Sequence, residues 1–94
     1  MRRVKDYDFG AAIKFYREEK NITRRQLSRD SGVSYSMISM MERGERKSIG
    51  ADSLKSISDV FGISCDQMLI TALLLSENAI EVHRNVSPVD KMSI

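Results

Sequence analysis

The stretch that decides the fold is TRRQLSRDSGVSYSMISMMERG, residues 23–44. Thr23 followed three residues later by Gln26 forms a capping box, a pattern typical of the start of a helix. Ser34 can cap a second helix in the same way. Gly32, between the two, tolerates the left-handed backbone of a tight turn. The stretch predicts two short helices, over about 24–30 and 34–43, joined by a glycine turn.

Such a helix pair places packing demands on particular positions. Where the helices meet the core the residues must be apolar, and where they cross closely the residue must be small. Six positions meet these demands at fixed spacing, including the glycine of the turn: Leu27, Ser28, Gly32, Val33, Ile38 and Met41. A helix-turn-helix is therefore predicted at the centre of the chain.

Helical patterns continue on both sides of the pair. Asp8 can cap a helix that runs to about Glu19, because apolar residues follow it with helical spacing (Phe9, Ala12, Ile13 and Tyr16). A fourth helix is expected over about 51–61, ending at Gly62, and Ser64 with Gln67 opens a fifth. The chain is predicted to be all-α, with five short helices.

Two segments carry a family resemblance: IKFYREEKNITRRQLSRDSGVSYSMISMMERGER (13–46) and SLKSISDVFGISCDQML (53–69). They resemble the Cro/repressor-type (Xre) helix-turn-helix family. The resemblance implies sequence-specific binding to double-stranded DNA, usually as a homodimer on an inverted repeat, to regulate transcription, most often as a repressor. Ser28 stands where relatives usually carry alanine, and the 47–51 loop lacks their frequent proline. The expected organisation is a five-helix repressor-like domain over 8–75, with a basic N-terminal arm (1–7) and a C-terminal extension (76–94).

Candidate DNA contacts surround the second and third helices. A cation in the first turn of a helix opposes the helix dipole, so Arg24 and Arg25 are expected to bind phosphate, with Arg24 also able to reach a base. The loop after the third helix would line the DNA backbone with more cations. The full set of expected DNA-binding residues is Arg24, Arg25, Ser34, Tyr35, Ser36, Ser39, Met40, Arg43, Arg46 and Lys47.

The outward residues of the third helix predict an unusual style of reading. Tyrosine, serine and methionine offer neither a bidentate arginine–guanine pair nor a glutamine–adenine pair. Specificity is expected to depend on thymine methyl groups, Arg24 and DNA shape. By resemblance, Arg17 and Glu42 form a partly buried structural ion pair.

The fifth helix is apolar most of the way round, which predicts burial on two sides. Ile70, Leu73 and Leu74 lie off its core stripe and are expected to form a two-fold dimer interface. Two alternatives stay open. In the first, residues 76–94 of the same chain fold back over this face, which is compatible with a dimer if Ile80, Val82, Val86 and Val89 wrap a partner subunit. In the second, the chain is an antitoxin-type module that binds a partner protein.

Composition bounds the remaining possibilities. Residues 1–47 carry 12 Lys/Arg against 7 Asp/Glu, whereas 48–94 carry 3 against 6, so the first half is suited to a polyanion. Arg2, Arg3 and Lys5 could follow a DNA backbone or enter a minor groove, or the arm could simply be disordered. A single cysteine (Cys65), no leader pattern and a longest apolar run near 68–75 favour a cytoplasmic protein and no membrane partner. With His83 alone and no catalytic grouping, no metal, cofactor or enzymatic activity is expected.

Overall fold

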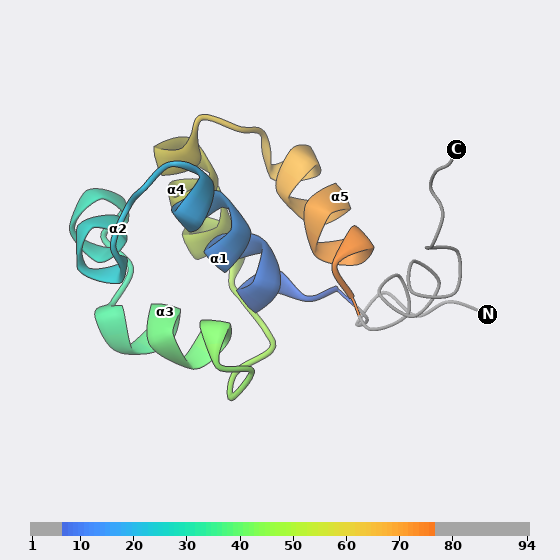
Figure 1. Ribbon diagram of the computed structural model, residues 1–94, viewed down its shortest axis with the longest axis horizontal. Helices are drawn as coiled ribbons and strands as arrows, with labels where there is room; N and C mark the ends of the chain where they lie inside the picture. Colours follow the sequence, from blue (N-terminus) through green and yellow to red (C-terminus); the bar gives the residue numbers. More distant parts are fainter. Residues whose placement is uncertain (1–6, 77–94) are drawn as a thin grey trace, which may run out of the picture.

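The computed structural model describes residues 7–76, which form five helices and no strand within that range (Figure 1). The helices are α1 (Phe9–Glu19), α2 (Arg24–Ser31), α3 (Tyr35–Glu42), α4 (Ala51–Phe61) and α5 (Cys65–Leu74). The predicted all-α, five-helix fold is confirmed. The second helix runs one residue further than expected, and the expected ends of the third are its two caps, Ser34 and Arg43.

Side chains define the start of four helices. The carboxylate of Asp8 accepts a hydrogen bond from the amide of Ala11 at 2.9 Å. Hydroxyls cap the starts of α2, α3 and α5, where Thr23, Ser34 and Ser64 each accept from the amide three residues on, at 3.0–3.1 Å. Each cap is worth about 1 kcal/mol, so the helix starts are encoded locally in the sequence.

All five helices contribute to one core. Its buried apolar residues are Ala12, Ile13, Leu27, Val33, Ile38, Met41, Ile57, Phe61, Met68 and Ala72. Helix α1 lies between α3 and α5 (Figure 1) and packs against both. On the α5 side, a 2.6 Å hydrogen bond joins the hydroxyls of Tyr16 and Thr71, and the amide of Asp8 donates to the carbonyl of Ala72 at 2.9 Å.

On the α3 side of α1, Gly10 permits a very close approach of two backbones. A Cβ added at Gly10 would lie 1.8 Å from the carbonyl oxygen of Met41. No backbone atom can be displaced that far without moving a helix, so a residue without a side chain is required here. The end of α3 is thereby held against the start of α1.

The remaining residues, 1–6 and 77–94, lie outside the described part of the chain. The expectations for Arg2, Arg3 and Lys5 of the arm, for His83, and for the apolar residues of the extension (Ile80, Val82, Val86 and Val89) therefore stay predictions. Within 7–76 no single helix is long and apolar enough to cross a membrane. Helices α4 and α5 are together long and apolar enough to do so, but they are bent by 95° relative to each other.

Candidate nucleic-acid interface

The turn between α2 and α3 is held by local hydrogen bonds. Gly32 adopts the left-handed conformation expected of it, with φ of 79°. The hydroxyl of Ser28 donates to the carbonyl of Val33 at 2.6 Å, and the amide of Val33 donates to the hydroxyl of Ser31 at 3.1 Å. The hydroxyl of Ser28 thus adds a hydrogen bond between α2 and the turn, which alanine could not form.

The end of α3 is anchored to α1 by a buried carboxylate. Arg17 donates from Nε to Oε2 of Glu42 at 2.8 Å and from Nη2 to Oε1 at 3.0 Å. The side chain of Glu42 is 1% exposed and that of Arg17 is 14% exposed. A third guanidinium hydrogen bond, from Nη1 of Arg17 to the carbonyl of Ile22 at 3.0 Å, ties in the loop before α2. The expected ion pair is present, and its hydrogen bonds raise the pKa of Arg17 above the usual value despite the opposing effect of burial.

The same carboxylate also binds Arg24, which the sequence did not reveal. Nε of Arg24 donates to Oε1 of Glu42 at 3.0 Å, and the arginine side chain remains 34% exposed. Two arginines thus share one buried carboxylate and leave a net positive charge at the surface. Arg24 was expected to bind phosphate and to be able to reach a base. The hydrogen bond to Glu42 restrains its position and leaves the rest of its guanidinium available to bind a phosphate.

Arg25 has different surroundings from its neighbour. Its guanidinium carbon lies 4.8 Å from the centroid of the Tyr35 ring, which is a cation–π contact between the first turn of α2 and the first residue of α3. Tyr35 is 40% exposed and Arg25 is exposed. The contact places a cation and an aromatic ring together beside the outer side of α3.

The expectation for Ser39 is wrong. It was assigned to the outward side of α3, but it is only 4% exposed. Ser39 lies one helical turn from both Tyr35 and Glu42, and these two residues are contacted by the start of α2. That side of α3 is therefore covered by α2, and Ser39 cannot reach a base in this arrangement.

The other expected residues of α3 are accessible to different degrees. Ser34, Tyr35 and Ser36 are exposed, and Met40 is half-buried. The hydroxyl of Ser34 already accepts the capping hydrogen bond from the amide of Met37, and its hydrogen remains available to donate. The outer surface of α3 thus offers hydroxyls, one aromatic ring and part of one thioether.

The segment after α3 carries the three remaining expected cations, all exposed: Arg43, Arg46 and Lys47. Arg43 forms a bidentate pair with Glu45, at 3.0 and 3.1 Å, and this pairing lowers the pKa of Glu45 and raises that of Arg43. The carbonyl of Met40 accepts from the amides of Glu45 and Arg46 at 2.9 and 3.2 Å, so the segment stays close to the end of α3. Exposed ion pairs contribute little, so Arg43 can exchange its carboxylate for a phosphate at small cost.

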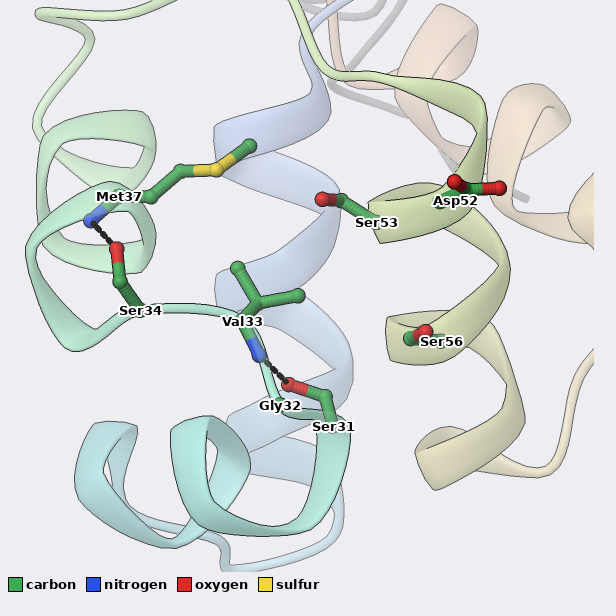
Figure 2. Close-up of a pocket in the computed structure, with 8 residues that line it drawn as sticks. All are labelled: Ser31, Gly32, Val33, Ser34, Met37, Asp52, Ser53 and Ser56. Carbon is green, nitrogen blue, oxygen red and sulfur yellow. Dashed lines mark hydrogen bonds between the residues drawn. The ribbon is translucent and has the colours of Figure 1, made fainter.

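A shallow hollow of about 280 Å³ lies between the α2–α3 turn and the first turns of α4 (Figure 2). Its lining residues are Ser31, Gly32, Val33, Ser34, Met37, Asp52, Ser53 and Ser56. The carboxylate of Asp52 disfavours a phosphate there, and the hydroxyls of Ser31 and Ser34 already accept backbone hydrogen bonds (Figure 2). In the described residues no three His, Cys, Asp or Glu side chains are grouped so as to hold a metal ion.

The outer side of α5 exposes large apolar side chains. Ile70 is 51% exposed and Leu74 is 62% exposed, whereas Leu73 is half-buried. Burying such side chains is favourable by roughly 1.5–3 kcal/mol each. Within residues 7–76 this surface is accessible, as the dimer prediction requires.

Two short capped helices, a left-handed glycine turn and the anchoring of α3 by Glu42 define a helix-turn-helix domain. Comparison with known proteins agrees. The family model described as "Helix-turn-helix" matches residues 13–68, and the chain belongs to that family.

Relatives and a solved structure carry related descriptions. Proteins from two strains of Mycobacterium tuberculosis, each named an uncharacterized HTH-type transcriptional regulator, are 37% identical over 66 residues, which is 70% of this chain. The chain spans 46% of the length of these relatives. The crystal structure of the clp gene regulator ClgR from Corynebacterium glutamicum matches with a TM-score of 0.69 and 28% identity, over 87% of this chain and 89% of that one.

Proposed function

We propose that the protein is a sequence-specific double-stranded DNA-binding transcriptional regulator that acts as a homodimer on an inverted repeat and represses transcription. The observation that carries the proposal is the grouping of cations around the outer surface of α3, all of them exposed except Arg24, whose side chain is 34% exposed. Arg24 and Arg25 lie at one edge of this surface, and Arg43, Arg46 and Lys47 follow its end.

The charge distribution supports a docking direction. Around α2 and α3 the exposed cations (Arg25, Arg29, Arg43, Arg46 and Lys47) outnumber the exposed carboxylates (Asp30 and Glu45), whereas α4 and α5 expose three aspartates (Asp52, Asp59 and Asp66) and one lysine, Lys55. A polyanion is therefore attracted to the α2–α3 side and repelled from the α4–α5 side. With α3 in a major groove, the cations that follow its end, Arg43, Arg46 and Lys47, are suited to bind the flanking phosphates.

A salt titration tests the docking face. Binding of a duplex should weaken steeply as salt increases, because each bound phosphate releases counterions. Arg43→Ala should weaken binding and lower the slope of log K against log salt by about 0.9 per protomer. Lys55→Ala is the matched control, since Lys55 is also exposed and also paired with one carboxylate, Asp59 at 3.1 Å. Equal effects of both variants would contradict the proposed face.

The dimer is proposed from the exposed side chains of α5. Leu74→Glu places a charge where the structure leaves 62% of the side chain accessible, so the monomer fold should not change. Sedimentation equilibrium should then give the mass of a dimer for the wild-type chain and of a monomer for the variant. Lys14→Glu, at an exposed position of α1, is the control for added negative charge.

The same experiment separates the alternative function. A wild-type chain that is monomeric at all concentrations would contradict the homodimer. It would favour the antitoxin-type protein-interaction module, in which the surface around Ile70, Leu73 and Leu74 binds another protein.

A further inference from the structure

Arg24 and Arg25 are adjacent in sequence but differ in what holds them. Arg24 donates from Nε to the buried carboxylate of Glu42. Arg25 lies over the ring of Tyr35, at 4.8 Å from its centroid. The first contact uses one donor of the guanidinium and partly neutralises its charge. The contact between Arg25 and Tyr35 is a cation–π contact and occupies none of the N–H donors of Arg25. Within residues 7–76 no hydrogen bond joins Arg25 to another side chain.

The aromatic contact also fixes where Arg25 lies. A free arginine side chain loses substantial rotamer entropy when it binds. Tyr35 is the first residue of α3 and is 40% exposed, so its ring forms a platform at the end of α3 that enters a major groove in such motifs. A guanidinium already resting on that platform has less freedom to lose, which favours a geometrically demanding contact over a loose one.

From this arrangement we infer that Arg25 is a specificity-determining residue that reads a guanine of the operator, and that Tyr35 positions it. The inference rests on the proposed DNA-binding function. Guanine is the base that presents two acceptors, O6 and N7, to a guanidinium in the major groove. The outer residues of α3 supply hydroxyls and a thioether, so the bidentate donor missing from α3 comes from α2.

A base-substitution experiment tests the inference. Duplexes selected by the wild-type chain from a random pool should contain a G·C pair in each half-site whose change to A·T weakens binding about tenfold or more. Arg25→Ala should bind the G·C and A·T duplexes with about equal affinity. Tyr35→Phe keeps the ring and should keep the discrimination, whereas Tyr35→Ala should reduce it. Both residues are exposed, and circular dichroism checks that each variant is folded.

Arg43→Ala is the control for a phosphate contact, since it should weaken all duplexes alike and lower the salt slope. If Arg25→Ala behaves in that way, Arg25 binds the backbone and the inference is wrong. Unchanged discrimination in Tyr35→Ala would overturn the role of the ring. If the wild-type chain binds every duplex equally, the proposed function itself fails. Selective wild-type binding with unaltered G·C preference in Arg25→Ala refutes only the inference.

Discussion

Replacement of Glu42 by glutamine tests how α3 is held in place. The amide has nearly the same shape as the carboxylate but no charge, and one of its two ends is a donor. In the wild-type protein Glu42 accepts two hydrogen bonds from Arg17 and one from Arg24, at 2.8–3.0 Å, with 1% of its side chain exposed. In Glu42→Gln only the single carboxamide oxygen can still accept hydrogen bonds from the two arginines. The two guanidinium groups then lie close together with no anion between them.

The expected loss of stability follows from the burial of Glu42. Breaking a buried ion pair by removing one partner costs about 3–5 kcal/mol. A domain the size of residues 7–76 has a total stability of roughly 4–10 kcal/mol, at about 0.05–0.15 kcal/mol per residue. The variant should therefore lose roughly 30% of its stability or more, and its Tm should fall by at least roughly 12 °C at about 4 °C per kcal/mol.

Urea and thermal unfolding, followed by circular dichroism at 222 nm, measure this loss. Glu45→Gln is the matched control, because it makes the same substitution in the exposed pair with Arg43, where both side chains are at least half exposed. Its unfolding midpoint should stay close to that of the wild type. If Glu42→Gln is no more destabilising than Glu45→Gln, the buried carboxylate of Glu42 does not stabilise the packing of α3.

Four further substitutions, one of them a control, have defined outcomes in the same unfolding experiments. Gly10→Ala gains about 1 kcal/mol of helix propensity, yet it should destabilise by a net 1–3 kcal/mol, roughly, because its Cβ meets a backbone oxygen at 1.8 Å. Gly50→Ala, with no atom within 4 Å of the new Cβ, should cost only about 0.5 kcal/mol, and equal losses would contradict the close approach. Tyr16→Phe should lose about 1 kcal/mol with its 2.6 Å hydrogen bond, and no loss would mean that water replaces it. Thr23→Ala should lose about 1 kcal/mol with the cap of α2, and an unchanged unfolding midpoint would contradict the contribution of this cap.

The helices could be predicted from sequence because their signals are local. Thr23, Ser34 and Ser64 act within three residues of their own position, and Gly32 needs only its own backbone. The ion pair between Arg17 and Glu42 came from family resemblance and not from spacing, since 25 residues separate the partners.

The contacts that could not be predicted join different helices. A single-helix pattern places Ser39 on the outward side of α3, because it contains no information about how α2 crosses. The sharing of Glu42 by Arg24, the position of Arg25 on Tyr35 and the approach of Gly10 to Met41 all depend on that crossing or on the packing of α1 against α3. Gly10 was the one visible signal, as a glycine inside an otherwise regular helical pattern.

The central claim is that the surface formed by α3 and the cations at its ends binds a specific duplex sequence as a symmetric dimer. Selection of bound duplexes by the full chain from a random pool tests it most directly. We expect enrichment of an inverted repeat, with half-site centres about one helical turn or a multiple apart. A pool that stays unenriched, or that yields a single site without two-fold symmetry, would contradict it.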